Sequence, residues 1–317
     1  MSILISGPSG RRMPRQVARR ALGSVFAGLM LTMPIVATAQ STAQPLASPA
    51  RTAPVSHPAP TLQEATEIAQ SDGWFRARGD HERAYWFARG GAMTRYRVYA
   101  PTAWDGKAKL PLVLVLHGGG GDQDGPFKDG DGAIAKIAEQ RGYILVSPMG
   151  FSTSGGFGSA FHAPAPEHGK AIGTPFAGPA ERALSEQDTL EVLDRTIREY
   201  GADPSRIYLM GNSMGGAGTW YLGERYPERW AAISPSDGPP VPDEYPSARL
   251  KGVNVLAVHG DKDALLPYQA TIELVARANA AGAHAQAIIV KDGTHGGAWV
   301  TVITQVFDFF DAHRKAD

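Results

Sequence analysis

Short apolar runs alternate with helical patterns along the chain from about residue 94 onward. Continuous apolar or β-rich runs predict strands at Thr94–Tyr99, Leu112–Leu116, Tyr143–Val146, Ile207–Met210, Trp230–Ile233, Val253–Val258 and Ala287–Val290. Apolar residues at helical spacing predict helices at Gly132–Gln140, Ser185–Tyr200, Ser213–Tyr226, Ile272–Ala278 and Val300–Ala312. Because the strands are apolar on both faces and alternate with helices, the pattern predicts an α/β protein. Its central sheet is expected to be mostly parallel, with helices on both faces.

The first 39 residues have the pattern of an export signal. Arginines cluster from Arg11 to Arg20, a mostly apolar stretch follows to Val36, and Ala37-Thr38-Ala39 fits a cleavage site. A membrane anchor is the alternative, but the apolar stretch is short for a full span. We therefore expect an exported protein, periplasmic or secreted, with no stable membrane anchor after cleavage of the signal.

The rest of the chain divides by composition. Residues 40–60 are rich in proline and alanine and predict a disordered linker. Residues 61–317 are expected to form a single domain. One long aperiodic stretch in it, about residues 150–179, is predicted to be a lid-like loop, because long irregular loops are often functional.

Charge and cysteine content exclude several classes of function. The formal net charge is zero, so nothing favours a nucleic acid as partner. The chain has no cysteine, which excludes a disulfide framework, a thiolate metal site and a cysteine nucleophile. No cofactor and no metal are expected.

A tight turn between a strand and a helix carries the strongest chemical signal. Gly211-Asn212-Ser213-Met214-Gly215 follows Ile207–Met210 and precedes a helical pattern, which is the context of a nucleophile elbow. Such a turn holds the serine Oγ above the sheet, and glycines beside it avoid a collision with neighbouring backbone. A serine in this position needs a histidine, an acid and an oxyanion hole.

Two loops at strand ends offer the acid and the base. His259-Gly260-Asp261-Lys262-Asp263 follows one strand, and Lys291-Asp292-Gly293-Thr294-His295 follows the next. The order serine, aspartate, histidine resembles the α/β-hydrolase superfamily over nearly all of the chain from about residue 94. The resemblance implies an α/β-hydrolase fold with the catalytic residues Ser213, Asp263 and His295. The alternatives that stay open are Asp261 and Asp237 for the acid, and His117 and His259 for the base.

A glycine run is the candidate oxyanion hole. His117-Gly118-Gly119-Gly120-Gly121 follows the strand Leu112–Leu116 and is similar to the glycine-rich loop of lipases and esterases. The resemblance implies that the backbone N–H groups of Gly119 and Met214 receive the oxyanion, with Gly118 as competitor for the loop's donor.

The segments Gly211–Trp220 and Arg225–Ala232 resemble a secreted esterase branch of the superfamily. That branch contains feruloyl esterases, polyhydroxyalkanoate depolymerases and carboxylesterases of prolyl-oligopeptidase type. The resemblance implies a serine hydrolase that cleaves a small-molecule or polymer-derived carboxylic ester through an acyl-enzyme. A serine peptidase with the same machinery is the first alternative. A non-catalytic binding protein on the same fold is the second.

Overall fold

The computed structural model describes residues 76–160, 177–238 and 248–315. The chain divides into two units, residues 1–57 and 58–317, and the described residues all belong to the second. The expected signal peptide, the expected linker and residues 161–176 of the expected lid-like loop therefore lie outside the described residues. Within the described part of the chain, no helix is both long and apolar enough to cross a membrane.

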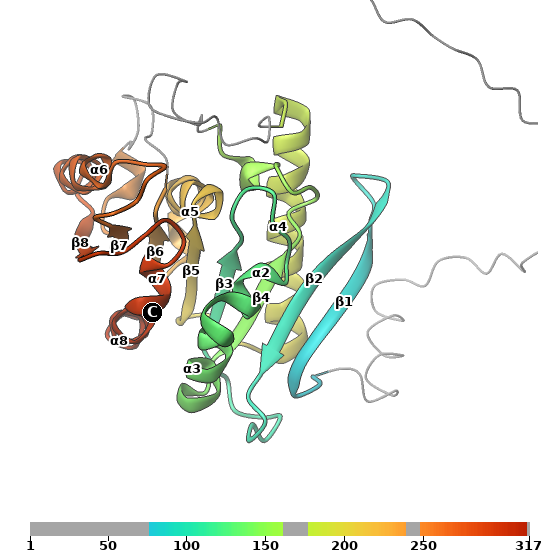
Figure 1. Cartoon of the computed structure of the whole chain (residues 1–317). Coiled ribbons are helices and arrows are strands. Elements are labelled where there is room, and N and C mark those ends of the chain that lie inside the picture. The colour runs from blue at the N-terminus through green and yellow to red at the C-terminus, as the bar shows by residue number, and fades with distance from the viewer. Residues whose placement is uncertain (1–75, 161–176, 239–247, 316–317) are drawn as a thin grey trace, which may run out of the picture. The chain divides into compact units, whose positions relative to one another are not determined.

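The centre of the second unit is an eight-stranded sheet with the order β1-β2-β4-β3-β5-β6-β7-β8. Strands β1 and β2 run antiparallel to their neighbours, and all other neighbouring strands are parallel (Figure 1). The bounds are β1 Gly79–Phe87, β2 Ala92–Ala100, β3 Leu112–Leu116, β4 Ile144–Pro148, β5 Ile207–Asn212, β6 Ala232–Ser236, β7 Asn254–Gly260 and β8 His284–Val290. This confirms the expected mostly parallel sheet, because β3 to β7 are parallel to one another and buried on both faces.

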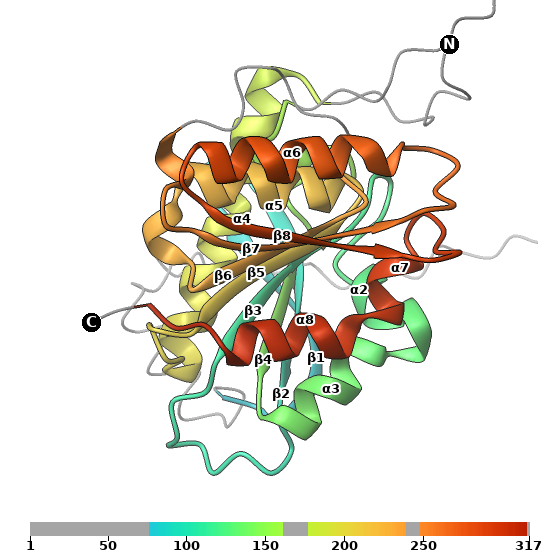
Figure 2. The same ribbon diagram turned by 90° about the vertical axis from the view of Figure 1, so that its left-hand side faces the viewer.

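Helices cover both faces of the sheet (Figure 2). One layer consists of α4 (Pro179–Tyr200), α5 (Met214–Arg225) and α6 (Tyr268–Ala280). The other consists of α3 (Ala133–Arg141) and α8 (Ile303–Asp311), with the short helices α2 (Gly125–Lys128) and α7 (Ala298–Thr301) beside them. Alternate residues of β3 face the two layers, so that Leu114 joins the first core and Val113 the second.

The structure differs from the prediction at one helix and one strand. The single helix expected at Val300–Ala312 is two helices, because the backbone leaves helical geometry at Val302 (φ −111°, ψ 19°). The strand β1 was not predicted. Its outward face carries Asp80 and Glu82, and on the inner side only Tyr85 and Phe87 are buried. As an edge strand it needs apolar residues on one face only.

The beginning of the expected lid-like loop packs onto the domain. The backbone amide of Phe151 donates to the buried carboxylate of Asp188 in α4, at 2.7 Å. The Phe157 ring is fully buried and meets the His117 ring edge-on, with centroids 5.1 Å apart. This part of the loop therefore supports the strand end that carries the glycine run.

Candidate active site

The turn at Ser213 has the backbone strain of a nucleophile elbow. Ser213 lies between β5 and α5 with φ 56° and ψ −116°, a conformation that L-residues adopt only at a cost of about 1–3 kcal/mol. Its amide donates to the carbonyl of Ser236 at the end of β6, at 2.9 Å. Neighbouring strands therefore hold the turn, and the serine side chain stands at the carboxyl edge of the sheet.

Glycines at both ends of the turn allow the backbones to approach closely. A Cβ added at Gly215 would lie 2.3 Å from the carbonyl oxygen of Leu116 in β3. A Cβ added at Gly211 would lie 2.5 Å from the carbonyl oxygen of Gly215. Both neighbours are backbone atoms that cannot rotate away, so a side chain at either position would push α5 off the sheet.

We expect Gly215→Ala to destabilise the fold by about 1–3 kcal/mol or more, because the new methyl group overlaps backbone of β3. The measurement is the denaturant midpoint in a chemical unfolding titration. Gly178→Ala is the matched control, since a methyl group there meets nothing within 4 Å. Equal midpoints for the two variants would contradict this account of the turn.

The structure brings Ser213, His295 and Asp263 into one chain of hydrogen bonds. His295 Nε2 lies 2.9 Å from Ser213 Oγ, and His295 Nδ1 lies 2.7 Å from Asp263 Oδ2. The three residues follow β5, β8 and β7, whose parallel strands end at the same edge. A ring that donates from Nδ1 to a carboxylate can accept the serine proton at Nε2, which is the geometry that nucleophilic catalysis requires.

Every acceptor position of the Asp263 carboxylate is in use. Its Oδ1 accepts from the amides of Leu265 and Leu266, at 2.8 and 3.0 Å. Its Oδ2 faces His295 and a second ring, that of His259, at 3.1 Å. Burial alone would raise the pKa of Asp263, but the hydrogen bonds from both histidines and both amides outweigh it and hold that pKa well below its usual range. The group therefore stays ionised.

The two alternative acids have other partners. Asp261 accepts from the amide of Asp292 at 2.6 Å. Asp237 is fully buried, and its two oxygens accept from the amides of Gly260 and Gly296, at 3.0 and 3.1 Å. Burial raises the pKa of Asp237, although the two amides oppose the shift. Asp237 therefore joins the loop after β7 to the loop after β8 and makes no hydrogen bond to the His295 ring.

Neither alternative base reaches Ser213 by a hydrogen bond. His117 is buried, with its ring nitrogens 2.8 and 3.0 Å from the carbonyl oxygens of Gly118 and Met149. Burial lowers the pKa of His117. His259 is buried behind Asp263. Sequence reasoning treated it as a competitor for His295 and missed its contact with the acid, although its position four residues before Asp263 was a usable signal.

The glycine loop leaves two amides for an oxyanion. The amide of Gly120 donates to Thr153 O at 2.8 Å, and that of Gly121 donates to Gly118 O at 3.1 Å. Among the described residues, no acceptor is found for the amides of Gly118 and Gly119. Met214 is the first residue of α5, so its N–H has no partner within the helix. A Cβ placed at Gly119 would lie 3.8 Å from Met214 Cβ, which shows how closely the two backbones approach.

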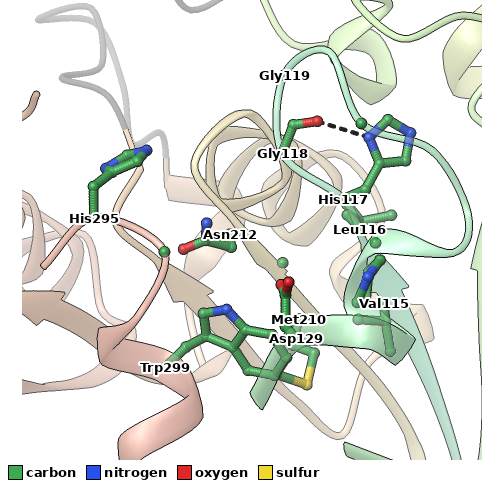
Figure 3. A pocket seen from close by; sticks show the side chains of 15 residues that line it. Val115, Leu116, His117, Gly118, Gly119, Asp129, Met210, Asn212, His295 and Trp299 are labelled. Atoms are coloured by element: carbon green, nitrogen blue, oxygen red, sulfur yellow. Dashed lines mark hydrogen bonds between the residues drawn. The ribbon is translucent and has the colours of Figure 1, made fainter. Parts of the chain in front are cut away.

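A pocket of about 410 Å³ opens beside these groups, between the glycine loop and the loop that carries His295 (Figure 3). Trp299 of α7 and Asn212 of β5 line it, and Asp129 lies at its lower side. Within the described residues, Trp299 Nε1 and Asn212 Oδ1 are buried without a hydrogen-bond partner. Unpaired buried polar atoms cost free energy, so the wall of this pocket carries two unfavourable positions.

The fold and site define an α/β-hydrolase. The sheet is mostly parallel, a serine lies on a strained turn between β5 and α5, and an acid and a histidine follow β7 and β8. The chain belongs to the esterase family, whose sequence model, described as "Putative esterase", matches residues 88–296. This confirms the expected superfamily and its esterase branch.

Two curated proteins similar to this chain are described as esterases. The chain is 28% identical over 179 residues to a bifunctional acetylxylan esterase/xylanase of Neocallimastix patriciarum, covering 56% of this chain and 23% of that one. It is 30% identical over 143 residues to feruloyl esterase B of Neurospora crassa, covering 45% and 44%. The chain thus spans less than half the length of these curated relatives.

Solved structures share the fold at low identity. A thermostable esterase matches with a TM-score of 0.57 and 19% identity, over 74% of this chain and 63% of that one. A feruloyl esterase from Anaeromyces mucronatus, solved with ferulic acid, matches with a TM-score of 0.54 and 16% identity, over 76% and 94%.

Proposed function

We propose that this chain is a serine carboxylesterase that works through an acyl-enzyme on Ser213. The observation that carries the proposal is the hydrogen-bond chain from Ser213 Oγ through His295 to Asp263. In the first step Ser213 Oγ attacks the ester carbonyl carbon while His295 Nε2 takes the hydroxyl proton. The tetrahedral intermediate then breaks its bond to the alkoxy group, which leaves as the alcohol with the proton from His295.

Water completes the cycle. His295 removes a proton from a water molecule while the water oxygen attacks the acyl carbon. The proton returns from His295 to Ser213 Oγ when the carboxylic acid leaves. Asp263 keeps the ring proton on Nδ1 and stabilises the charged ring in both steps. In each step the carbonyl oxygen becomes an oxyanion, and we assign its donors to Met214 and Gly119, with Gly118 as competitor. One such donor contributes about 3 kcal/mol to a transition state.

Acetyl and feruloyl esters are the substrates we propose, because the named relatives are acetylxylan and feruloyl esterases. The pocket of about 410 Å³ exceeds the needs of an acetyl group alone. We further propose that residues 1–39 are an export signal and that residues 61–317 form one catalytic domain after a linker at 40–60.

The test is turnover of 4-nitrophenyl acetate, methyl ferulate and a peptidyl 4-nitroanilide, combined with labelling by a fluorophosphonate probe. We expect hydrolysis of at least one ester far above that of the anilide, together with labelling of Ser213 as located by peptide mapping. Comparable turnover of the anilide would establish the peptidase alternative. Absence of both labelling and turnover would establish the binding-protein alternative.

A further inference from the structure

A second buried imidazole contacts the proposed catalytic acid. His259, at the end of β7, is fully buried, and its Nε2 lies 3.1 Å from Asp263 Oδ2, the same oxygen that faces His295. Its Nε2 also lies 3.2 Å from the carbonyl oxygen of Leu266. The mechanism above gives this ring no role, although it touches the acid directly.

The partners of His259 determine where its proton lies. The ionised Asp263 Oδ2 and the carbonyl of Leu266 can only accept, so Nε2 carries a hydrogen. In a neutral ring Nδ1 must then accept, and its neighbour is the hydroxyl of Thr271 in α6, at 2.7 Å. The hydroxyl is able to donate, so Thr271 fixes the tautomer that points a donor at Asp263.

The charged surroundings of His259 are the two buried aspartates. Asp263 belongs to the loop after β7, and Asp237, at the end of β6, has its Oδ1 3.9 Å from His259 Nε2. The contact from α6 is the uncharged Thr271. His295 contacts the same oxygen of Asp263 through its Nδ1. Asp237, His259 and Asp263 are spaced closely enough to hold a metal ion. However, the oxygens of both aspartates already accept hydrogen bonds.

We propose that Thr271 and His259 are positioning residues that extend the triad to five members, Thr271–His259–Asp263–His295–Ser213. This inference rests on the proposed function. The donor from His259 holds the carboxylate in one orientation and shares the negative charge of Oδ2 with His295. Loss of this donor would leave more negative charge on Oδ2, and more negative charge beside an imidazole favours the protonated ring.

A matched pair of variants tests the role of the donor. Glutamine and methionine have similar length and shape, but only the glutamine amide can donate to Asp263 in place of His259 Nε2. His295 must be unprotonated to act as base, so tighter proton binding moves the acid limb of the rate profile to higher pH. We expect His259→Met to move this limb upward by about half a pH unit or more, and to lower the maximal rate. His259→Gln should stay close to the wild type in the position of the limb.

The readout is the rate of Ser213 labelling by a fluorophosphonate between pH 4 and 9, which requires no knowledge of the natural ester. Equal limbs in the Gln and Met variants would overturn the inference, because a merely structural role moves both alike. An inactive wild type that is not labelled would instead refute the proposed function.

Thr271 offers an independent arm if the His259 variants fail to fold. Thr271→Val removes the hydroxyl at nearly constant shape, and we expect a smaller upward shift of the same limb, with Thr271→Ser restoring the wild-type position. Thr196→Val is the control, because Thr196 is another buried helical threonine, and its hydroxyl donates to the carbonyl of Val192 in α4 and not to an imidazole. A shift of the limb in Thr196→Val, or none in Thr271→Val, would overturn the relay.

Discussion

Ser213→Ala is expected to lower kcat for ester hydrolysis by at least about 10⁴-fold, because no acyl-enzyme can form without Oγ. The pocket and the two candidate oxyanion donors remain in place, so KM should change little. The measurement is the steady-state rate on the best ester of the substrate panel. Circular dichroism of the variant should match the wild type, since Cβ is kept and the strained backbone is unchanged.

The same variant separates two explanations of any remaining activity. Residual turnover at a low level that is proportional to enzyme is expected from the pocket and the oxyanion donors alone. Turnover within about tenfold of the wild type would refute Ser213 as nucleophile, because catalysis would then have to come from another group.

Asp263→Asn is expected to lower kcat by roughly 10⁴-fold while leaving the fold intact. Both rings contact Oδ2, so an amide NH₂ in that position leaves both rings without their acceptor. The opposite orientation turns the NH₂ toward the backbone amides of Leu265 and Leu266, which can only donate. If His295 moves its proton to Nε2 in response, it can no longer take the proton of Ser213. The measurement is the same ester assay, with the unfolding midpoint followed in parallel.

Asp261→Asn is the matched control for that experiment. Asp261 lies two residues away on the same loop and is partly exposed, and its carboxylate accepts from the amide of Asp292. Asparagine retains an oxygen that can accept the same bond, so we expect activity within a few-fold of the wild type. A larger loss in Asp261→Asn than in Asp263→Asn would reverse the assignment of the acid.

The parallel centre of the fold could be predicted from sequence because its signals are local. The run Leu112–Leu116 is apolar at every position, and the structure confirms that strand with the predicted bounds. The elbow glycines and the strand-end positions of Asp263 and His295 follow from the same logic, since parallel strands place their carboxyl ends together. Their catalytic roles remain predictions.

Other features depend on tertiary contacts that no local pattern records. Arg83 in β1 makes an ion pair with Glu199 of α4, and the backbone of β1 pairs with β2. These contacts stabilise a strand whose charged sequence does not by itself predict one. The bend at Val302 leaves no mark on the apolar pattern. The contact between His259 and Asp263 requires a loop that curls back on its own strand, which a spacing of four residues permits but does not impose.

The position of β8 at one edge of the sheet makes the proposed base the most easily displaced member of the site. Among the strands that the structure describes, β8 pairs with β7 alone, and its residues His284, Gln286 and Ala287 are exposed. By contrast, β5 beneath Ser213 is buried between two neighbouring strands. Edge elements with few buried contacts open at a lower free energy than the centre of a domain. Local opening of this edge would withdraw His295 from an otherwise folded molecule. On heating, the loss of activity and the exchange of the β8 amides should then occur together. Both should occur at lower temperature than unfolding of the core.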